Sequence, residues 1–334
     1  MKVSFYTTSD NLKTNNGYGY AGSHVRQSLE NLGHEVKFHD EHSDIQIDFC
    51  QPPLYSHFKN QYKIGYTPWE STDIPSNWMS GFDSVDEVWT TSQKCKEWFE
   101  NAGVKKPVRV YEHGIESIWQ PKKRNVGSRL RFLHVGEPAG RKGGQMTVEA
   151  FRQAFGSRED VHLTIKAHGH STVRAYASHV NRGGPRSILG VPHEVYNNVS
   201  LIEDNLSIEE LVGLYHTHHV LVYPSWGEGF GLIPLQGLAT GMPTICTGAW
   251  APYERFLGDL SLDSKEYSSP WPNIHPGRMY KPDFNQLIDM FKFSFDEFDG
   301  LSSSFFEQSE TVHLEYNWDT LTKNAFAHLG EFNK

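Results

Sequence analysis

One turn of this sequence holds a carboxylate between glycines. Residues 220–223 are apolar and β-branched, as in a buried strand, and the chain continues Pro-Ser-Trp-Gly-Glu-Gly-Phe-Gly-Leu, which sets Glu228 between two glycines. Gln236 follows eight residues later, in a helix predicted over residues 233–240. Ligands of open α/β sheets bind beyond the carboxyl ends of the strands. Glu228 can therefore approach the hydroxyl groups of a sugar there, and a buried structural carboxylate is the alternative.

A second turn carries two cations. Residues 132–135 form a predicted strand, and Arg141 and Lys142 lie in the glycine-rich stretch between it and a helix predicted over residues 145–155. Two cations beside the free N–H groups of a helix start favour an anion such as a diphosphate. The Walker pattern G-x-x-x-x-G-K-[ST] does not occur in the sequence, so nothing points to ATP hydrolysis. Two solvated basic residues on a turn are the alternative.

Three glycines near the start match a dinucleotide-binding pattern. Gly17, Gly19 and Gly22 fit G-x-G-x-x-G, and Asp40 lies about 20 residues further on. The first glycine comes about nine residues after the strand predicted over residues 3–7, whereas the dinucleotide fingerprint turns directly at the strand tip. Three interpretations stay open: a flexible turn before a helix, a loop of an acceptor or sugar site, and a dinucleotide site.

Length and composition limit the classes of protein. At about 150 residues per domain, 334 residues correspond to roughly two domains. The formal charge of −9 disfavours a surface made mainly for phosphate backbones. No apolar run approaches the roughly 18 to 20 residues of a membrane-spanning helix, and the start lacks the apolar segment of a signal peptide. With 3 widely spaced cysteines, we expect a cytoplasmic protein without a transmembrane segment.

Strands and helices alternate along the chain in the βαβ rhythm of parallel sheets. Strands are predicted over residues 3–7, 35–39, 62–66, 87–90, 108–111, 132–135, 162–166, 199–202, 220–223 and 244–246. Helices are predicted over residues 24–32, 93–102, 145–155, 208–216, 233–240 and 318–329. The polar, basic and turn-rich stretch 121–131 divides the two series. We therefore predict an α/β protein with two Rossmann-like domains.

The turn that contains Glu228 is part of a longer motif. Residues 224–243, Pro-Ser-x-x-Glu-Gly-Phe-Gly-Leu-x-x-Leu-x-x-Leu-Ala-x-Gly-x-Pro, resemble the carboxyl-terminal signature of family-4 retaining glycosyltransferases of the GT-B fold. Three further stretches come in the order that the family shows: residues 66–72 with Trp78 and residues 86–92; residues 110–116 with Pro121; and residues 135–136 with residues 141–143. The resemblance covers nearly the whole chain.

The resemblance implies a GT-B architecture of three segments. Residues 1–125 would form an amino-terminal Rossmann-like domain that binds the acceptor. Residues 126–311 would form a second Rossmann-like domain, which binds a nucleotide sugar across a cleft from the first. Residues 312–334 would form a crossover helix that packs back across the domains.

The resemblance also implies which residues hold the donor. Arg141 and Lys142 would neutralise the diphosphate of a nucleoside diphosphate sugar, with UDP-sugars expected first, and Glu228 would bind hydroxyls of the sugar. Gln236 would hold the ribose, where the family usually has a second glutamate. Glu137 stands where the family usually has an arginine. The implied donor-binding residues are Gly136, Gly143, His113, Gly229, Phe230, Gly231, Leu232 and Gln236. For His113, a role in the hinge turn is the alternative.

The acceptor is expected against the amino-terminal half, with Gly17, Tyr18, Gly19 and Trp69 as its binding residues. Glu70 is the candidate for orienting or deprotonating the acceptor hydroxyl, and a solvated loop carboxylate is the alternative. The implied catalytic residues are Glu228, Lys142, Arg141 and Glu70. In the family, an oxygen of the leaving phosphate is thought to take the acceptor proton, so no cofactor and no metal are expected. The 18 histidines show no metal-site pattern.

The acceptor and the oligomeric state stay open. A glycan, a glycolipid or a small molecule is expected first. Residues 161–193 contain no Asp or Glu but carry Lys166, Arg174, Arg182 and Arg186, which motivates a hydroxymethylated DNA base as a minority hypothesis, with a solvated surface loop as the alternative. Two other functions also remain: an NAD-dependent oxidoreductase, based on the first glycines, and a catalytically silent sugar-nucleotide binding protein, suggested by Gln236 and Glu137.

Overall fold

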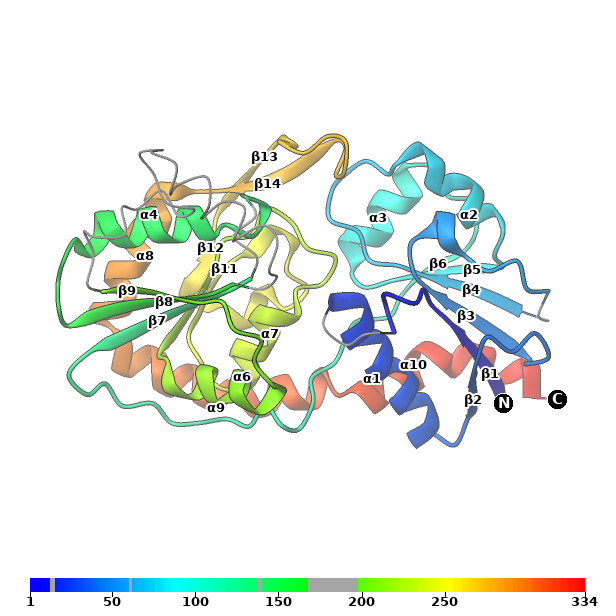
Figure 1. The fold of residues 1–334 in the computed structure, drawn as a ribbon, viewed down its shortest axis with the longest axis horizontal. Coiled ribbons are helices and arrows are strands. Elements are labelled where there is room, and N and C mark those ends of the chain that lie inside the picture. Colours follow the sequence, from blue (N-terminus) through cyan, green and yellow to red (C-terminus); the bar gives the residue numbers. More distant parts are fainter. Residues whose placement is uncertain (13–15, 60–61, 137–139, 168–197, 334) are drawn as a thin grey trace.

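Two parallel sheets stand side by side in the computed structural model (Figure 1). The structure describes residues 1–12, 16–59, 62–136, 140–167 and 198–333. The first sheet contains β1 (Lys2–Tyr6), β2 (Glu35–Phe38), β3 (Ile45–Phe49), β4 (Tyr62–Tyr66), β5 (Glu87–Thr90) and β6 (Val108–Val110), in the order β2-β1-β3-β4-β5-β6. Its helices are α1 (Gly17–Asn31), α2 (Met79–Asp83) and α3 (Gln93–Asn101). All its strand pairs are parallel, as the alternating sequence predicts.

The second sheet has the strand order of a Rossmann fold. It contains β7 (Leu130–Val135), β8 (Val161–Lys166), β9 (Val199–Ile202), β10 (Val220–Tyr223), β11 (Thr244–Thr247) and β12 (Ser261–Leu262), in the order β12-β11-β10-β7-β8-β9. Its helices are α4 (Gly144–Phe155), α6 (Ile208–Thr217), α7 (Leu232–Ala239), α8 (Phe284–Asp296) and α9 (Phe298–Glu315). The strand order reverses between β7 and β10, and ligands of such sheets bind beyond the carboxyl ends of the two strands at this point.

Helix α1 begins earlier than predicted. The sequence suggests a helix over residues 24–32 after a glycine-rich turn, but α1 starts at Gly17. Asn16 has an extended backbone, and its side chain accepts a hydrogen bond of 2.8 Å from the N–H of Gly19, which is the geometry of a helix N-cap. The three glycines of the G-x-G-x-x-G pattern therefore lie in the first turns of a helix and not in a loop.

The last helix packs against the first half of the chain. Helix α9 runs along the lower side of Figure 1 from the second half toward the first, and α10 (Trp318–Phe326) continues beside α1. Glu116 joins these parts, because its carboxylate accepts hydrogen bonds of 2.8 Å from Tyr20, Trp119 and Trp318. The packing of α10 agrees with the crossover helix that the family resemblance implies.

A hairpin links the two halves on the other side. Strands β13 (Ser264–Ser268) and β14 (Arg278–Pro282) pair antiparallel and lie at the top of Figure 1, between the two sheets. The N–H of Arg278 donates to Thr72 Oγ1 at 2.8 Å, and the N–H of Thr72 donates back to the carbonyl of Arg278 at 3.0 Å. The tip of the hairpin is thereby tied to a loop of the first half. The sequence analysis predicts no element in this region.

Candidate active site

The two cations of the second glycine-rich turn lie at the carboxyl end of β7. Arg141 and Lys142 belong to the short 3-10 turn η3 (Gly140–Lys142), which leads into α4. Gly143 precedes the helix with a φ of +77°, a left-handed conformation that favours glycine. A Cβ at this position would overlap the backbone carbonyl of Pro224, so the turn after β7 and the turn after β10 are in direct contact.

Glu228 connects these two turns. Lys142 Nζ donates to both carboxylate oxygens of Glu228 at 2.8 Å, and Arg141 Nη1 lies 3.1 Å from Oε1. Two hydroxyls complete the environment, since Ser225 Oγ donates at 2.8 Å and Tyr223 at 3.0 Å. Among the described residues, these five polar contacts hold the carboxylate and orient it toward the cations.

The two cations keep this buried carboxyl ionised. Glu228 is 7% exposed, and burial alone would raise its pKa. Arg141 and Lys142 outweigh that effect and lower the pKa of Glu228 to about 2. Burial also lowers the pKa of Lys142, although Glu228 opposes the shift. The site therefore concentrates charges of both signs where little water reaches them.

The first half of the chain contributes Glu70. Its carboxylate lies 4.0 Å from Arg141 and 3.7 Å from the ring of His275, which comes from the hairpin segment between β13 and β14. Glu70, Arg141, Lys142 and Glu228 are thus brought together, as the sequence analysis predicts for the catalytic residues. His275 joins them without having been predicted.

The glycines around Glu228 permit close contact between the two halves. A Cβ at Gly227 would overlap the carbonyl of Glu70. The carbonyl of Gly229 accepts a hydrogen bond of 2.6 Å from Thr91 Oγ1 of the first half. Gly231 is the N-cap of α7 with a φ of +86°, and Leu232 is the first residue of that helix. The glycine-rich turn therefore fixes the loop of Glu70 against the turn of Glu228.

His113 lies next to Phe230 in the junction between the halves. Their ring centroids are 5.2 Å apart, and Trp318 of α10 lies 5.6 Å from His113 on another side. His113 is 5% exposed, and burial lowers its pKa to about 3, so the ring is neutral near pH 7. Its Nε2 has no hydrogen-bond partner among the described residues.

Gln236 is buried on α7. The hydroxyl of Tyr215 lies 3.4 Å from Oε1 of its amide. Its side-chain nitrogen makes no hydrogen bond to another described residue, which leaves the amide a donor for a ligand. The side-chain amide of Gln236, the predicted ribose-binding residue, is therefore available to donate a hydrogen bond to a ligand.

The residues predicted for the acceptor lie on the side of Glu70. Gly17 and Gly19 are in the first turn of α1, and the hydroxyl of Tyr18 lies 2.7 Å from Thr67 Oγ1, at the start of the loop that carries Glu70. Trp69 is 3% exposed and donates its indole N–H to the carbonyl of Asp73 at 2.8 Å. Trp69 therefore shapes the loop from within the core.

Besides His275, three polar residues of the site were missed by the sequence analysis. Tyr223 and Ser225 bind Glu228 and lie within five residues of it, so the motif itself contains the signal for them. His134 of β7 donates from Nδ1 to the carbonyl of Val222 at 2.9 Å, and its Nε2 has no partner among the described residues. A buried histidine inside an apolar strand gives no such signal in the sequence.

Several predicted features lie outside the described residues. Glu137 is one, and so is the greater part of the acid-free stretch, with Arg174, Arg182 and Arg186. Lys166 is described and ends β8. Within the described part of the chain, no group of three or more His, Cys, Asp or Glu side chains could hold a metal ion.

Comparison with known proteins places this site in a family. Residues 92–250, which include both turns of the site, match the family described as Family 4 Glycosyltransferase in conflict systems. This part of the chain is similar to family-4 glycosyltransferases, and the chain as a whole has the GT-B fold. This finding confirms the resemblance on which the predicted fold rests. No curated protein matches the sequence of this chain.

Solved structures show the same fold over the whole chain. A glycosyltransferase from Rickettsia africae has a TM-score of 0.72 at 12% identity, and covers 100% of this chain and 99% of its own. Anabaena HepE, solved in complex with UDP-glucose, has a TM-score of 0.70 at 11% identity, with 99% and 100% covered. The sucrose-phosphate synthase of Thermosynechococcus elongatus has a TM-score of 0.67 at 13% identity, with 99% of each chain covered. In the described part of the chain, no helix is long and apolar enough to cross a membrane.

Proposed function

We propose that this glycosyltransferase moves a sugar from a nucleoside diphosphate sugar, with UDP-sugars first, to an acceptor hydroxyl with retention of the anomeric configuration and without a metal ion. The observation that carries the proposal is the contact of Glu228 with Lys142 and Arg141 at the point where the strand order of a Rossmann sheet reverses. The structure of HepE with UDP-glucose supports the choice of donor.

The donor would bind along the carboxyl ends of β7 and β10. The N-terminus of α4 and the two cations before it would stabilise the diphosphate, including the negative charge that grows as the sugar leaves. Lys142 has three N–H donors, and Glu228 uses two of them, so the third can reach a phosphate oxygen. Glu228 would bind hydroxyls of the sugar.

Two buried polar residues would hold the rest of the donor. Gln236 would hydrogen bond the ribose through its amide, and the unpartnered Nε2 of His113 would contact the donor beside Phe230. Gly136, Gly143, Gly229, Gly231 and Leu232 would supply backbone close to the ligand. Glycine allows such close approach because it has no Cβ.

The acceptor would approach from the side of Glu70. Its hydroxyl oxygen forms the new bond to the anomeric carbon on the face from which the diphosphate leaves, and an oxygen of the leaving phosphate takes the hydroxyl proton. Glu70, held near Arg141 and His275, would orient that hydroxyl. Gly17 and Tyr18 would line the surrounding surface, and the buried Gly19 and Trp69 would support it from below. A glycan, a lipid, a small molecule or a modified DNA base remains the acceptor class to test.

The segment boundaries of the sequence analysis belong to this proposal. Residues 1–125 would bind the acceptor, residues 126–311 the donor, and residues 312–334 would connect the two. We also propose a cytoplasmic location, which the three buried free cysteines support.

Release of UDP tests the proposal. The purified protein is incubated with UDP-glucose and other UDP-sugars in the presence of EDTA, with methanol as a small surrogate acceptor. We expect UDP and a methyl glycoside with the anomeric configuration of the donor, identified by NMR. An inverted glycoside contradicts retention, and a reaction that requires added Mg²⁺ or Mn²⁺ contradicts metal independence.

Ligand-induced stabilisation tests the donor class independently. A ligand at about 100 times its dissociation constant stabilises the folded state by roughly 2.7 kcal/mol. We expect UDP to raise the unfolding midpoint by several degrees and NAD to leave it unchanged. A shift with NAD alone would support the oxidoreductase alternative, and UDP binding without any product would support the silent binding protein.

A further inference from the structure

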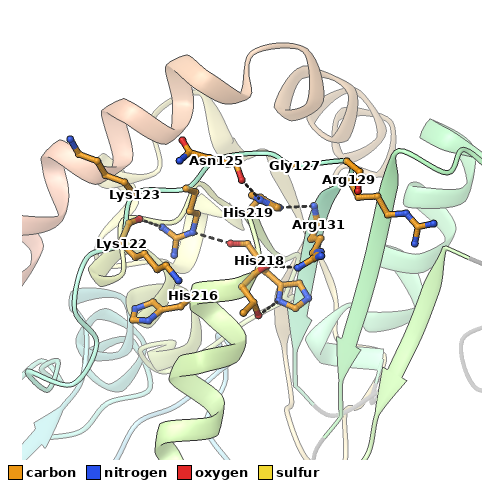
Figure 2. Close-up of a pocket in the computed structure, with 12 residues that line it drawn as sticks. Lys122, Lys123, Asn125, Gly127, Arg129, Arg131, His216, His218 and His219 are labelled. Carbon is orange, nitrogen blue, oxygen red and sulfur yellow. Dashed lines mark hydrogen bonds between the residues drawn. The ribbon is translucent and has the colours of Figure 1, made fainter.

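A basic pocket lies at the opposite end of the second sheet from the active site. It has a volume of about 410 Å³ and is formed by the linker around residues 122–131 and by the turn between α6 and β10 (Figure 2). Strands β7 and β10 begin at this pocket and end at the active site. Because β7 has 6 residues at about 3.3 Å each, the two sites are roughly 20 Å apart.

The charged residues that line the pocket are all positively charged. None of the 12 residues that line it is Asp or Glu, whereas five are Lys or Arg: Lys122, Lys123, Arg124, Arg129 and Arg131. None of these five makes an ion pair among the described residues. In a chain of net charge −9, this concentration of unpaired cations in one concave place is unusual.

Arg124 is the buried part of this charge. It is 7% exposed, and its guanidinium donates to the carbonyls of Lys122, Tyr215, His218 and Thr240 and to the hydroxyl of Thr240. All these acceptors are neutral, so they satisfy the N–H groups without cancelling the charge. A buried cation without a counter-charge is costly, and an anion in the pocket would compensate it.

The donors left for a ligand are on the other four cations. Lys122, Lys123, Arg129 and Arg131 are exposed at the pocket, and Figure 2 shows their side chains around it. The neighbouring histidines are engaged: Nδ1 of His219 accepts from the N–H of Arg131 at 2.8 Å, and Nδ1 of His218 donates to the carbonyl of Leu214 at 2.7 Å. These rings form walls of the pocket, and the lysines and arginines supply its charge.

We propose that this pocket is a second anion site, which binds a small molecule with two or more phosphate groups. The four exposed cations and the one buried arginine carry five positive charges together, which favours a ligand with several negative charges over one with a single charge. The concave shape fits a compact ligand better than a flat membrane or a DNA duplex. The site is independent of the donor site, because it lies at the other end of the strands and shares no residue with it.

Titration calorimetry with inorganic tripolyphosphate at low ionic strength tests the proposal on the full chain. We expect binding that persists in the Lys142→Ala variant, in which the diphosphate site is damaged. The double variant Arg129→Gln/Arg131→Gln should bind tripolyphosphate at this site at least roughly tenfold more weakly than the unchanged protein. The matched control is Lys105→Gln/Lys106→Gln, which removes the same charge from the first half. It should bind as the unchanged protein does.

Four outcomes would overturn the proposal. Loss of all binding in Lys142→Ala would assign the tripolyphosphate to the donor site alone. Equal weakening in the control pair would show a general effect of net charge. Unchanged binding in the Arg129/Arg131 variant would exclude the pocket. Tighter binding of duplex DNA or of phosphatidylserine vesicles through the same arginines would assign the surface to a macromolecule. Failure of the UDP experiments would leave this test unaffected, since neither site depends on the other.

Discussion

Lys142 Nζ lies 2.8 Å from both carboxylate oxygens of Glu228, and this contact joins two motifs that are 86 residues apart in the chain. Each motif follows a central strand of the second sheet, so the fold delivers both to the same edge. The carboxylate balances the cations, and the cations keep the carboxylate ionised. In a nucleoside diphosphate sugar, the phosphate oxygens can bind Lys142, and the sugar hydroxyls can donate hydrogen bonds to Glu228.

Removal of either partner should abolish most of the activity. We expect Lys142→Ala and Glu228→Gln each to lower kcat/KM for UDP-sugar roughly 100- to 1,000-fold, as the loss of one stabilising group for transition-state charge does in other enzymes. The control is Lys105→Ala, an exposed lysine of the first half, which should retain the original kcat/KM. Rates of UDP release measure the effect, and near-original rates in both variants would contradict the site.

The ionisation of Glu228 should appear in the pH dependence of stability. Its pKa is about 2 in the folded protein against an ordinary value of 4.5, so its stabilising contribution is fully present above about pH 5 and is lost as the pH falls toward 2. The Glu228→Gln variant lacks this contribution at every pH. We expect the difference in unfolding free energy between the original protein and the variant to shrink from pH 5 to pH 3. Chemical denaturation at each pH measures it, and a constant difference would show that the carboxyl is not held ionised by the cations.

Two glycines provide a matched test of the turn before α4, because one is tightly packed and the other faces open space. Gly143→Ala places a Cβ on the carbonyl of Pro224 at a left-handed backbone, and should destabilise the protein by about 1–3 kcal/mol. Gly213→Ala introduces a Cβ into open space within α6, and should stabilise it by about 0.5–1 kcal/mol. Thermal unfolding separates the two directions. A stable Gly143→Ala variant would mean that the two turns do not need their close contact.

The sequence predicts residues 130–247 of the second half well because the signals there are local, but β12, α8 and α9, between residues 261 and 315, were not predicted. Residues 220–223 of the predicted strand coincide with β10, and the glycine-flanked Glu228 falls where the family motif sets it. The sequence predicts the first half less well. The polar residues Gln46 and Asp48 interrupt the apolar pattern of β3, and that strand was missed, although the fold buries both side chains.

Other errors concern a helix cap and contacts between distant segments. Asn16 acts as an N-cap, so glycines that look like a loop form the first turns of α1. His275 reaches Glu70 only because the β13–β14 hairpin crosses to the other half, and the basic pocket forms only because the linker lies against the turn after α6. Neither arrangement leaves a periodicity or spacing in the chain from which it could be predicted.

Substitutions of Gln236 can distinguish a role in donor binding from a role in packing. The amide is 6% exposed and shares a hydrogen bond with Tyr215, so it has a packing role whether or not it binds the ribose. If it does bind the ribose, Gln236→Leu should raise KM for the UDP-sugar roughly tenfold, since about 1.4 kcal/mol corresponds to a factor of ten, and should change kcat less. Gln236→Glu keeps an acceptor oxygen and should stay within a few-fold of the original KM. Gln153→Leu on the exposed side of α4 is the control. Steady-state kinetics decide the matter, because a packing residue alone would lower stability in Gln236→Leu and leave KM as it was.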